Sequence, residues 1–373
     1  MSKKKNEVLL DRDDLNINSK NEEKNNGYPL ENLKVDKGFY TAFELKRKFE
    51  KQLIKLDDDF QREDVWKPKQ KIELIESVLM GLPLPIFYFN QDKKGVLIVV
   101  DGRQRLTALF SYMSNEFKLS NLKILPKKFE KKFSELDPVD QTKLEDYQIQ
   151  AHVILPPTPE RVKFDIFDRV NRAGTQLNKQ EIRNALYQGQ STKLLKELSE
   201  SDEFKKATEE DLESDKRMKS RYLLLRYISF YLLRTNKLHD AKGVVYEYKT
   251  IDELLAYTME TINAYSEEEV KELQKNVIST LNKCSHYISK DAFRLNQNGK
   301  RSPINMNVFE TICYILTFIS DGLPVENVHN KLLGLKSNKN FLINIGNHRD
   351  SEMNVKARFD MADKIIKELE NDR

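Results

Sequence analysis

An acid, a glycine, a glutamine and two arginines follow one another directly where a short apolar segment ends. Residues 96–100 read Val-Leu-Ile-Val-Val, which is typical of a buried strand, and Asp101-Gly-Arg-Gln-Arg105 comes next. Apolar residues then recur at the spacing of one helix face: Leu106, Leu109, Phe110 and Met113. Where a strand turns into a helix, free backbone N–H groups and the helix dipole attract anions. We therefore predict a phosphate-binding site at residues 101–105.

The side chains of this segment suit the same chemistry. Gly102 allows the backbone to approach a ligand closely, and Arg103 and Arg105 carry guanidinium groups whose paired donors match phosphate oxygens. The alternative is that Asp101 and Gly102 only shape the turn, since such residues are common at turns. The apolar segments that precede the loop favour the functional interpretation, because they make it the end of a central element.

Capping residues and apolar spacing predict the elements that position this loop. Thr41-Ala-Phe-Glu44 is a capping-box pattern, Pro68 suits the first turn of a helix, and Gly81 suits its end. The predicted elements are a helix from about 42 to 53, a helix from 68 to about 80, a hairpin of 86–89 with 96–100, a helix from about 103, a strand at 147–154, a helix that Pro159 begins, and a helix after the capping pattern Asn178-Lys-Gln-Glu181.

In the second half of the chain, the sequence pattern predicts helices only. Apolar residues with helical spacing recur from about residue 191 onward, at 221–234, 251–262, 267–288, 308–319 and 355–369. Residues 1–30 are rich in charged residues and Asn and show no period, which is typical of a flexible tail. We expect an α+β protein with a tail at 1–30, a domain with a small sheet and helices at 31–190, and an all-α domain at 191–373.

Composition narrows the functional classes. The 63 basic and 59 acidic residues give a net charge of +4, which argues against a histone-like polycation but allows a local basic groove. Only Cys284 and Cys313 are present, so neither a disulfide framework nor a paired-cysteine metal site is expected. No apolar run is long enough to span a bilayer. We expect a cytoplasmic protein without a membrane partner.

A second basic segment is a candidate for contact with nucleic acid. Six lysines lie between residues 118 and 132, and Phe117, Phe129 and Phe133 lie among or beside them. Such a segment can bind a nucleic-acid backbone. The alternative is a solvated face whose phenylalanines anchor it to the core. The candidate nucleic-acid contacts are Lys127, Lys128, Lys131 and Lys132.

Four segments in this order closely resemble the N-terminal domain family of GmrSD-type restriction endonucleases, which has a ParB/sulfiredoxin-like fold. They are Phe60-Gln-Arg-Glu-Asp-Val-Trp66, Gly81-Leu-Pro-Leu-Pro85, Asp101-Gly-Arg-Gln-Arg105 with Leu-Thr after it, and the stretch from Phe167 to Tyr187. The resemblance covers about residues 38–190. The usual signature of the family is Asp-Gly-Gln-Gln-Arg, so Arg103 is a departure at its middle position, one that remains compatible with phosphate binding.

The resemblance implies that an NTP is bound and hydrolysed during restriction of foreign DNA in bacterial phage defence. Residues 101–105, with Gly102 and Gln104 among the binding residues, would form the phosphate loop. Gln61 and Arg62 would approach the pocket from the preceding loop, and Asn171 and Arg172 would close it. Asp101, Arg103 and Arg105 would carry the catalysis: the arginines neutralise phosphate charge, and Asp101 orients a water molecule or binds Mg²⁺.

Full-length members often carry a second, HNH-like nuclease domain, which the sequence does not indicate here. Histidines of the C-terminal half are scattered, and Asn347-His-Arg-Asp350 is too isolated to form such a site. His152, in the first half, has no second metal-binding residue nearby in sequence. We therefore expect a stand-alone member of the family with a helical partner domain.

Three functions stay open from the sequence. The first is an NTPase that senses or acts on DNA, alone, with a second copy of itself, or with a nuclease or other defence protein. The second is a metal-dependent DNA nickase or endonuclease, for which Asp101 and the acids of 57–59, Glu63 and Asp64 would supply ligands. The third is a module that binds a nucleotide as a switch, without hydrolysis, and binds a partner through its helical half.

Overall fold

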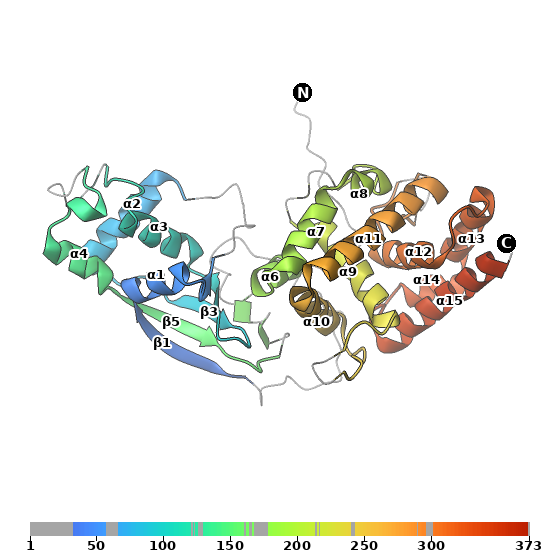
Figure 1. Ribbon diagram of the computed structural model, residues 1–373, viewed down its shortest axis with the longest axis horizontal. Coiled ribbons are helices and arrows are strands. Elements are labelled where there is room, and N and C mark those ends of the chain that lie inside the picture. Colours follow the sequence, from blue (N-terminus) through green and yellow to red (C-terminus); the bar gives the residue numbers. More distant parts are fainter. Residues whose placement is uncertain are drawn as a thin grey trace, which may run out of the picture. The chain divides into compact units, whose positions relative to one another are not determined.

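The computed structural model describes residues 33–56, 66–120, 122, 124–125, 130–159, 162–163, 166–167, 178–212, 215, 217–239, 243–288, 290–295 and 301–371 (Figure 1). The expected tail at 1–30 lies outside these residues. Contacts divide the chain into two compact units between Leu177 and Asn178. The sheet belongs to the first unit and the second is mostly helical, which confirms the predicted α+β class. By its contacts, the segment 178–190 belongs with the helices.

The first unit is built on a mixed five-stranded sheet with the order β1-β5-β3-β4-β2. Its strands are β1 (Val35–Thr41), β2 (Ile54–Lys55), β3 (Phe87–Gln91), β4 (Leu97–Asp101) and β5 (Gln148–Ile154). The predicted hairpin is the antiparallel pair β3–β4, and the predicted strand at 147–154 is β5. β5 lies between β1, to which it is antiparallel, and β3, to which it is parallel. β5, the last strand in the sequence, thus lies beside β1, the first.

The helices α1 to α4 of this unit lie on one side of the sheet (Figure 1). They are α1 (Ala42–Glu50), α2 (Pro68–Leu79), α3 (Arg103–Met113) and α4 (Pro138–Glu145), and a short 3-10 turn, η3 (Phe133–Glu135), precedes α4. The predicted helical face of Leu106, Leu109, Phe110 and Met113 is buried in the core between helices and sheet. Helix faces and sheet face therefore meet in one apolar layer.

The first predicted helix is confirmed at its start and is shorter than expected at its end. The Thr41 hydroxyl accepts a hydrogen bond from the backbone N–H of Glu44 at 3.0 Å, as a capping residue does. The helix ends at Glu50 rather than near 53, because Gln52 takes a left-handed backbone conformation with φ +57°. The chain then enters β2, where Ile54 is buried.

The second unit contains the helices α6 (Lys179–Leu186), α7 (Gln190–Glu200), α8 (Asp202–Ala207), α9 (Lys219–Arg234), α10 (Ile251–Ala264), α11 (Glu267–Tyr287), α12 (Met306–Phe318), α13 (Val325–Ser337), α14 (Lys339–Asn344) and α15 (Glu352–Asn371). All five helical segments predicted here are confirmed. Every residue from Met306 to Leu316 of α12 is buried, as expected for a helix at the centre of a bundle. None of the described helices combines the length and apolarity that a membrane span needs.

Candidate functional site

The candidate loop begins at a β-bulge in β4. Phe89 pairs with Val99, but Tyr88 pairs with Asp101, so β4 has one extra residue between the two pairs. Without it, the two-residue period of a strand would turn Asp101 to the same face as Val99, which lies in the core. The bulge instead places Asp101 opposite Tyr88, on the other face. A carboxylate is thereby kept out of the apolar layer.

Two features of the structure favour glycine at position 102: the backbone conformation and a neighbouring aromatic ring. Gly102 precedes α3 in a left-handed conformation with φ +99°, which L side chains rarely adopt. A Cβ atom at this position would lie 2.1 Å from Cδ1 of Phe87. The structure therefore gives a packing reason for glycine here, and the predicted close approach of a ligand stays a prediction.

Arg105 connects the loop to the segment before β3. Its Nη2 donates to Oδ2 of Asp101 at 2.7 Å, and its Nη1 donates to the carbonyl oxygen of Pro85. The guanidinium carbon lies 4.1 Å from the centre of the Phe87 ring. Burial lowers the pKa of Arg105, although the neighbouring Asp101 carboxylate acts in the opposite direction. Because these contacts occupy much of the guanidinium, the geometry gives Arg105 a positioning function, and a catalytic one stays a prediction.

The Gly-Leu-Pro-Leu-Pro segment at 81–85 is held where Arg105 can reach it. The Tyr147 hydroxyl, just before β5, donates to the carbonyl oxygen of Leu82 at 2.7 Å and accepts from the backbone N–H of Leu84 at 3.0 Å. Two of the segments that carry the family resemblance, 81–85 and 101–105, are therefore in direct contact through Arg105. Their order in the sequence could not show this.

The remaining loop residues lie at the N-terminus of α3. Arg103 is the first residue of that helix, and the N-cap residue before it is Gly102, which has no capping side chain. Gln104 Oε1 lies 3.5 Å from the backbone nitrogen of Trp66, which places the end of the preceding loop beside the candidate site. Gln61 and Arg62, which were expected to approach from that loop, lie outside the described residues, as do Asn171 and Arg172. Their predicted positions are therefore untested.

The C-terminal end of the resembling region packs among the helices of the second unit. Asn178 caps α6 as predicted. Its Oδ1 accepts hydrogen bonds from the backbone N–H groups of Gln180 and Glu181, and the side chain of Glu181 accepts one from the backbone N–H of Asn178. Lys179 Nζ lies 2.9 Å from a carboxylate oxygen of Asp252 at the start of α10, and Arg183 contacts the other oxygen. Two cations thus share one acid of α10.

Two of the four candidate nucleic-acid lysines are described. The carbonyl oxygen of Lys131 accepts from the Tyr112 hydroxyl near the end of α3, and Lys132 precedes η3. Phe117 and Phe133 pack against the core, which confirms the anchoring half of the alternative interpretation for these two rings. Lys127 and Lys128, with Phe129, lie outside the described residues. Contact with nucleic acid stays a prediction for all four lysines.

A metal site can be tested only for Asp101. Among the described residues, no group of three or more His, Cys, Asp or Glu side chains gathers in a way that could hold a metal ion. The acids at 57–59, Glu63 and Asp64 lie outside them. The second oxygen of Asp101, Oδ1, is not the one that Arg105 contacts, and one carboxylate with substrate phosphates is a usual ligand set for Mg²⁺. Asp101 therefore fits an ion shared with a nucleotide.

Strand register reveals a row of polar side chains that the sequence did not predict. Asp101 pairs with Tyr88, Tyr88 with His152, and His152 with Lys37. Paired residues of neighbouring strands point to the same face of a sheet. The Tyr88 and His152 rings meet edge to face, with centroids 5.2 Å apart. The only sequence signal was the alternation of β5, which placed His152 on its polar phase without showing its neighbours.

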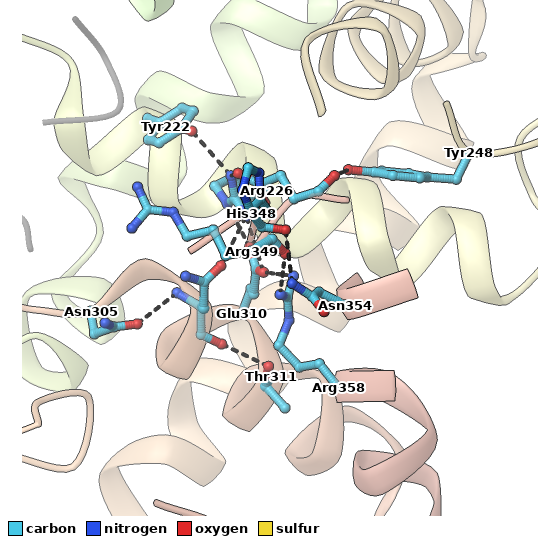
Figure 2. A network of polar contacts seen from close by, with 12 residues as sticks. Tyr222, Arg226, Tyr248, Asn305, Glu310, Thr311, His348, Arg349, Asn354 and Arg358 are labelled. Carbon is cyan, nitrogen blue, oxygen red and sulfur yellow. Dashed lines mark hydrogen bonds and ion pairs between the residues drawn. The ribbon is translucent and has the colours of Figure 1, made fainter. Parts of the chain in front are cut away.

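A second polar centre, also not predicted, is buried in the helical unit (Figure 2). Arg226 of α9 contacts Glu310 of α12 through Nε at 2.6 Å, and both side chains are fully buried. Arg226 Nη2 also contacts Asp350 at 2.7 Å, and Arg358 of α15 contacts Glu310 at 2.6 Å. The Tyr248 hydroxyl donates to the carbonyl oxygen of Asp350. Since Arg358 also donates to the carbonyl oxygen of Arg349, the Asn-His-Arg-Asp segment at 347–350 contacts both α9 and α15.

The sequence was compared with models of known protein families. Residues 39–188 match the family model described as GmrSD restriction endonuclease, N-terminal domain. No curated protein and no solved structure matches the chain. The match includes the whole candidate loop, β2 to β5 and α6, and it ends before α7. It agrees with the family resemblance of the four segments.

Proposed function

We propose, from the match of residues 39–188 to the N-terminal domain family of GmrSD restriction endonucleases, that the chain binds and hydrolyses an NTP within a restriction system that senses or acts on DNA. The observation that carries the proposal is the N-terminus of α3. It follows β4 directly, its N-cap residue is Gly102, which has no capping side chain, and its first residue is Arg103. Such an end presents free N–H groups and a positive dipole to an anion.

The charges around the loop favour a phosphate ligand. An uncompensated carboxylate at Asp101 would repel phosphate, but Arg105 pairs with it at 2.7 Å. Arg103 adds a second guanidinium at the first position of the helix. The loop therefore presents a net positive charge where the helix dipole is also positive, and both attract the same phosphate group.

The three charged residues of the loop have proposed tasks in the reaction. Arg103 binds phosphate oxygens and offsets the charge that develops on them. Arg105 positions Asp101, and Oδ1 of Asp101 accepts a hydrogen bond from the attacking water. Mg²⁺, when bound by Asp101 and the nucleotide, would neutralise phosphate charge. Gln61, Arg62, Asn171 and Arg172 are proposed to complete the nucleotide pocket.

The partners follow from the same premise. DNA is the proposed macromolecular ligand, with Lys127, Lys128, Lys131 and Lys132 as proposed backbone contacts. A nuclease or another defence protein, or a second copy of this chain, is the proposed protein partner. The helical unit, most of which lies outside the family match, is the proposed surface for such contacts.

Phosphate release from ATP, GTP, CTP and UTP, with and without DNA, tests the proposal. We expect turnover that Asp101→Ala and Arg103→Ala abolish and that Arg47→Ala retains, since Arg47 is an exposed arginine on α1. Nucleotide binding that depends on Arg103 without turnover would replace the NTPase by a nucleotide switch. Mg²⁺-dependent plasmid nicking without NTP would replace it by a nuclease. Neither binding nor turnover would contradict the proposal altogether.

A further inference from the structure

At β1, the face of the sheet opposite α1 to α4 is uncovered and carries an exposed aromatic ring. Phe39 of β1 is 65% exposed, although phenylalanine is usually buried. Its neighbour in sequence, Tyr40, points to the other face, where its ring lies 6.1 Å from that of the core residue Phe89. Since successive side chains of a strand alternate, Phe39 must project from the uncovered face.

Strand pairing defines what surrounds this ring. Phe39 pairs with Gln150 of β5, and the next pair on the same face is Lys37 with His152. Gln150 is exposed and His152 is half-buried. On the opposite face of the same strand, Ile149, Ala151 and Val153 are buried in the core. The uncovered face thus combines an aromatic ring with an amide, an imidazole and a cation.

The charge of this face suits a polyanion. β1 and β5 are described over their whole length, and none of their outward-facing positions is acidic. Those positions are Val35, Lys37, Phe39, Thr41, Gln148, Gln150 and His152, whereas Ile154, at the same phase of β5, is fully buried. The centre of a protein-docking face is depleted of charged side chains, lysine among them. Here the centre is Phe39 with Gln150 and Lys37, which are the residue types that stack on bases, bond to base edges and contact phosphates.

We propose that this uncovered sheet face binds unpaired bases of single-stranded DNA, with Phe39 as the stacking ring, Gln150 as a hydrogen-bonding partner of the base edge and Lys37 as a phosphate contact. The inference rests on the DNA part of the proposed function. Bases inside a duplex are stacked on each other and cannot lie flat on a sheet, so a strand with unpaired bases is the ligand that this geometry accepts.

The face leads to the candidate loop. The row Lys37, His152, Tyr88 and Asp101 crosses from β1 to β4, which is three strand spacings, or about 14 Å. Tyr88 and His152 offer two further rings along that path. A bound strand of two or three nucleotides would therefore reach from Phe39 to the start of the loop, and occupation of the one site can influence the other.

Fluorescence anisotropy of the full chain with a labelled oligothymidine of about 15 nucleotides tests the inference in the absence of NTP. We expect Phe39→Ala to weaken binding about tenfold or more, because one base loses its stacking ring. Phe39→Trp should retain affinity. Phe43→Ala is the matched control: Phe43 is 51% exposed but lies on α1, away from the sheet face. Unlabelled duplex of the same length should compete more weakly than the single strand.

Two results would overturn the inference. The first is equal oligonucleotide affinity of the Phe39→Ala and Phe43→Ala variants. The second is loss of self-association or of a protein complex in Phe39→Ala with unchanged oligonucleotide binding, which would make the face a protein interface. Failure of the NTPase is distinguishable, because it would remove phosphate release and leave Phe39-dependent oligonucleotide binding intact.

Discussion

Gly102 lies so close to Phe87 that a Cβ atom on the glycine would be 2.1 Å from the ring of the phenylalanine. The same ring supports the Arg105 guanidinium at 4.1 Å from its centre. Phe87 itself is buried at the start of β3. One ring thus fixes two residues of the candidate loop, which makes the loop conformation part of the core packing.

Gly102→Ala should destabilise the first unit by about 3 kcal/mol, because it adds left-handed backbone strain to a steric conflict with Phe87. Urea unfolding followed by Trp66 fluorescence measures this, since the chain has one tryptophan and it packs against the core of that unit. Gly81→Ala is the matched control: its φ is +74°, but a Cβ atom added to Gly81 would meet no other atom within 4 Å. It should cost only about 1 kcal/mol. Equal effects would contradict the packing argument.

Arg105→Lys should weaken the first unit by about 1–2 kcal/mol, although it keeps the charge. A lysine cannot contact Asp101 and the Pro85 carbonyl with one planar group, and it loses the flat contact with Phe87. The same Trp66 transition reports the loss. If Arg105 acts only by positioning, the variant should also bind nucleotide more weakly in proportion to this loss. Full stability with lost binding would instead favour direct contact with phosphate.

Glu310→Gln should destabilise the helical unit by about 3–5 kcal/mol, because Arg226 and Arg358 would keep buried charges without their shared acid. Far-UV circular dichroism during urea unfolding, which reports mainly helices, measures it, and the Trp66 transition should stay unchanged. Glu368→Gln is the control, since Glu368 contacts Lys331 at 2.5 Å but is 38% exposed. That change should cost below about 1 kcal/mol.

Asp350→Asn should reduce the acid sensitivity of the helical unit. Burial alone would raise the pKa of Asp350, but Arg226, Arg358 and Arg349 outweigh it and hold that pKa below its ordinary value of 3.8. A lowered pKa contributes stability that is present above the ordinary value and lost as the pH falls through the folded-state value. The difference between the urea midpoints of wild type and variant should therefore be largest at about pH 7 and should decrease as the pH falls below 3.8. A difference between the two urea midpoints that stays the same at every pH would contradict the lowered pKa of Asp350.

Local chemistry determined where the helices and strands lie. Thr41 and Asn178 cap their helices as predicted, and the face from Leu106 to Met113 is buried. These signals depend on residues within about four positions of one another, so a sequence displays them directly. For the same reason the sequence placed the Asp-Gly-Arg-Gln-Arg segment correctly at a strand-to-helix turn.

Contacts between distant residues were decided by the tertiary structure alone. The bulge of β4 turns Asp101 away from the core, and insertion of β5 beside β3 brings His152 next to Tyr88. Arg226 contacts Asp350, which lies 124 positions later in the chain. Such pairs depend on strand register and helix packing, which are set by the whole core and leave no periodic pattern in the sequence. The sequence thus determined which residues could do chemistry, and the fold determined which of them meet.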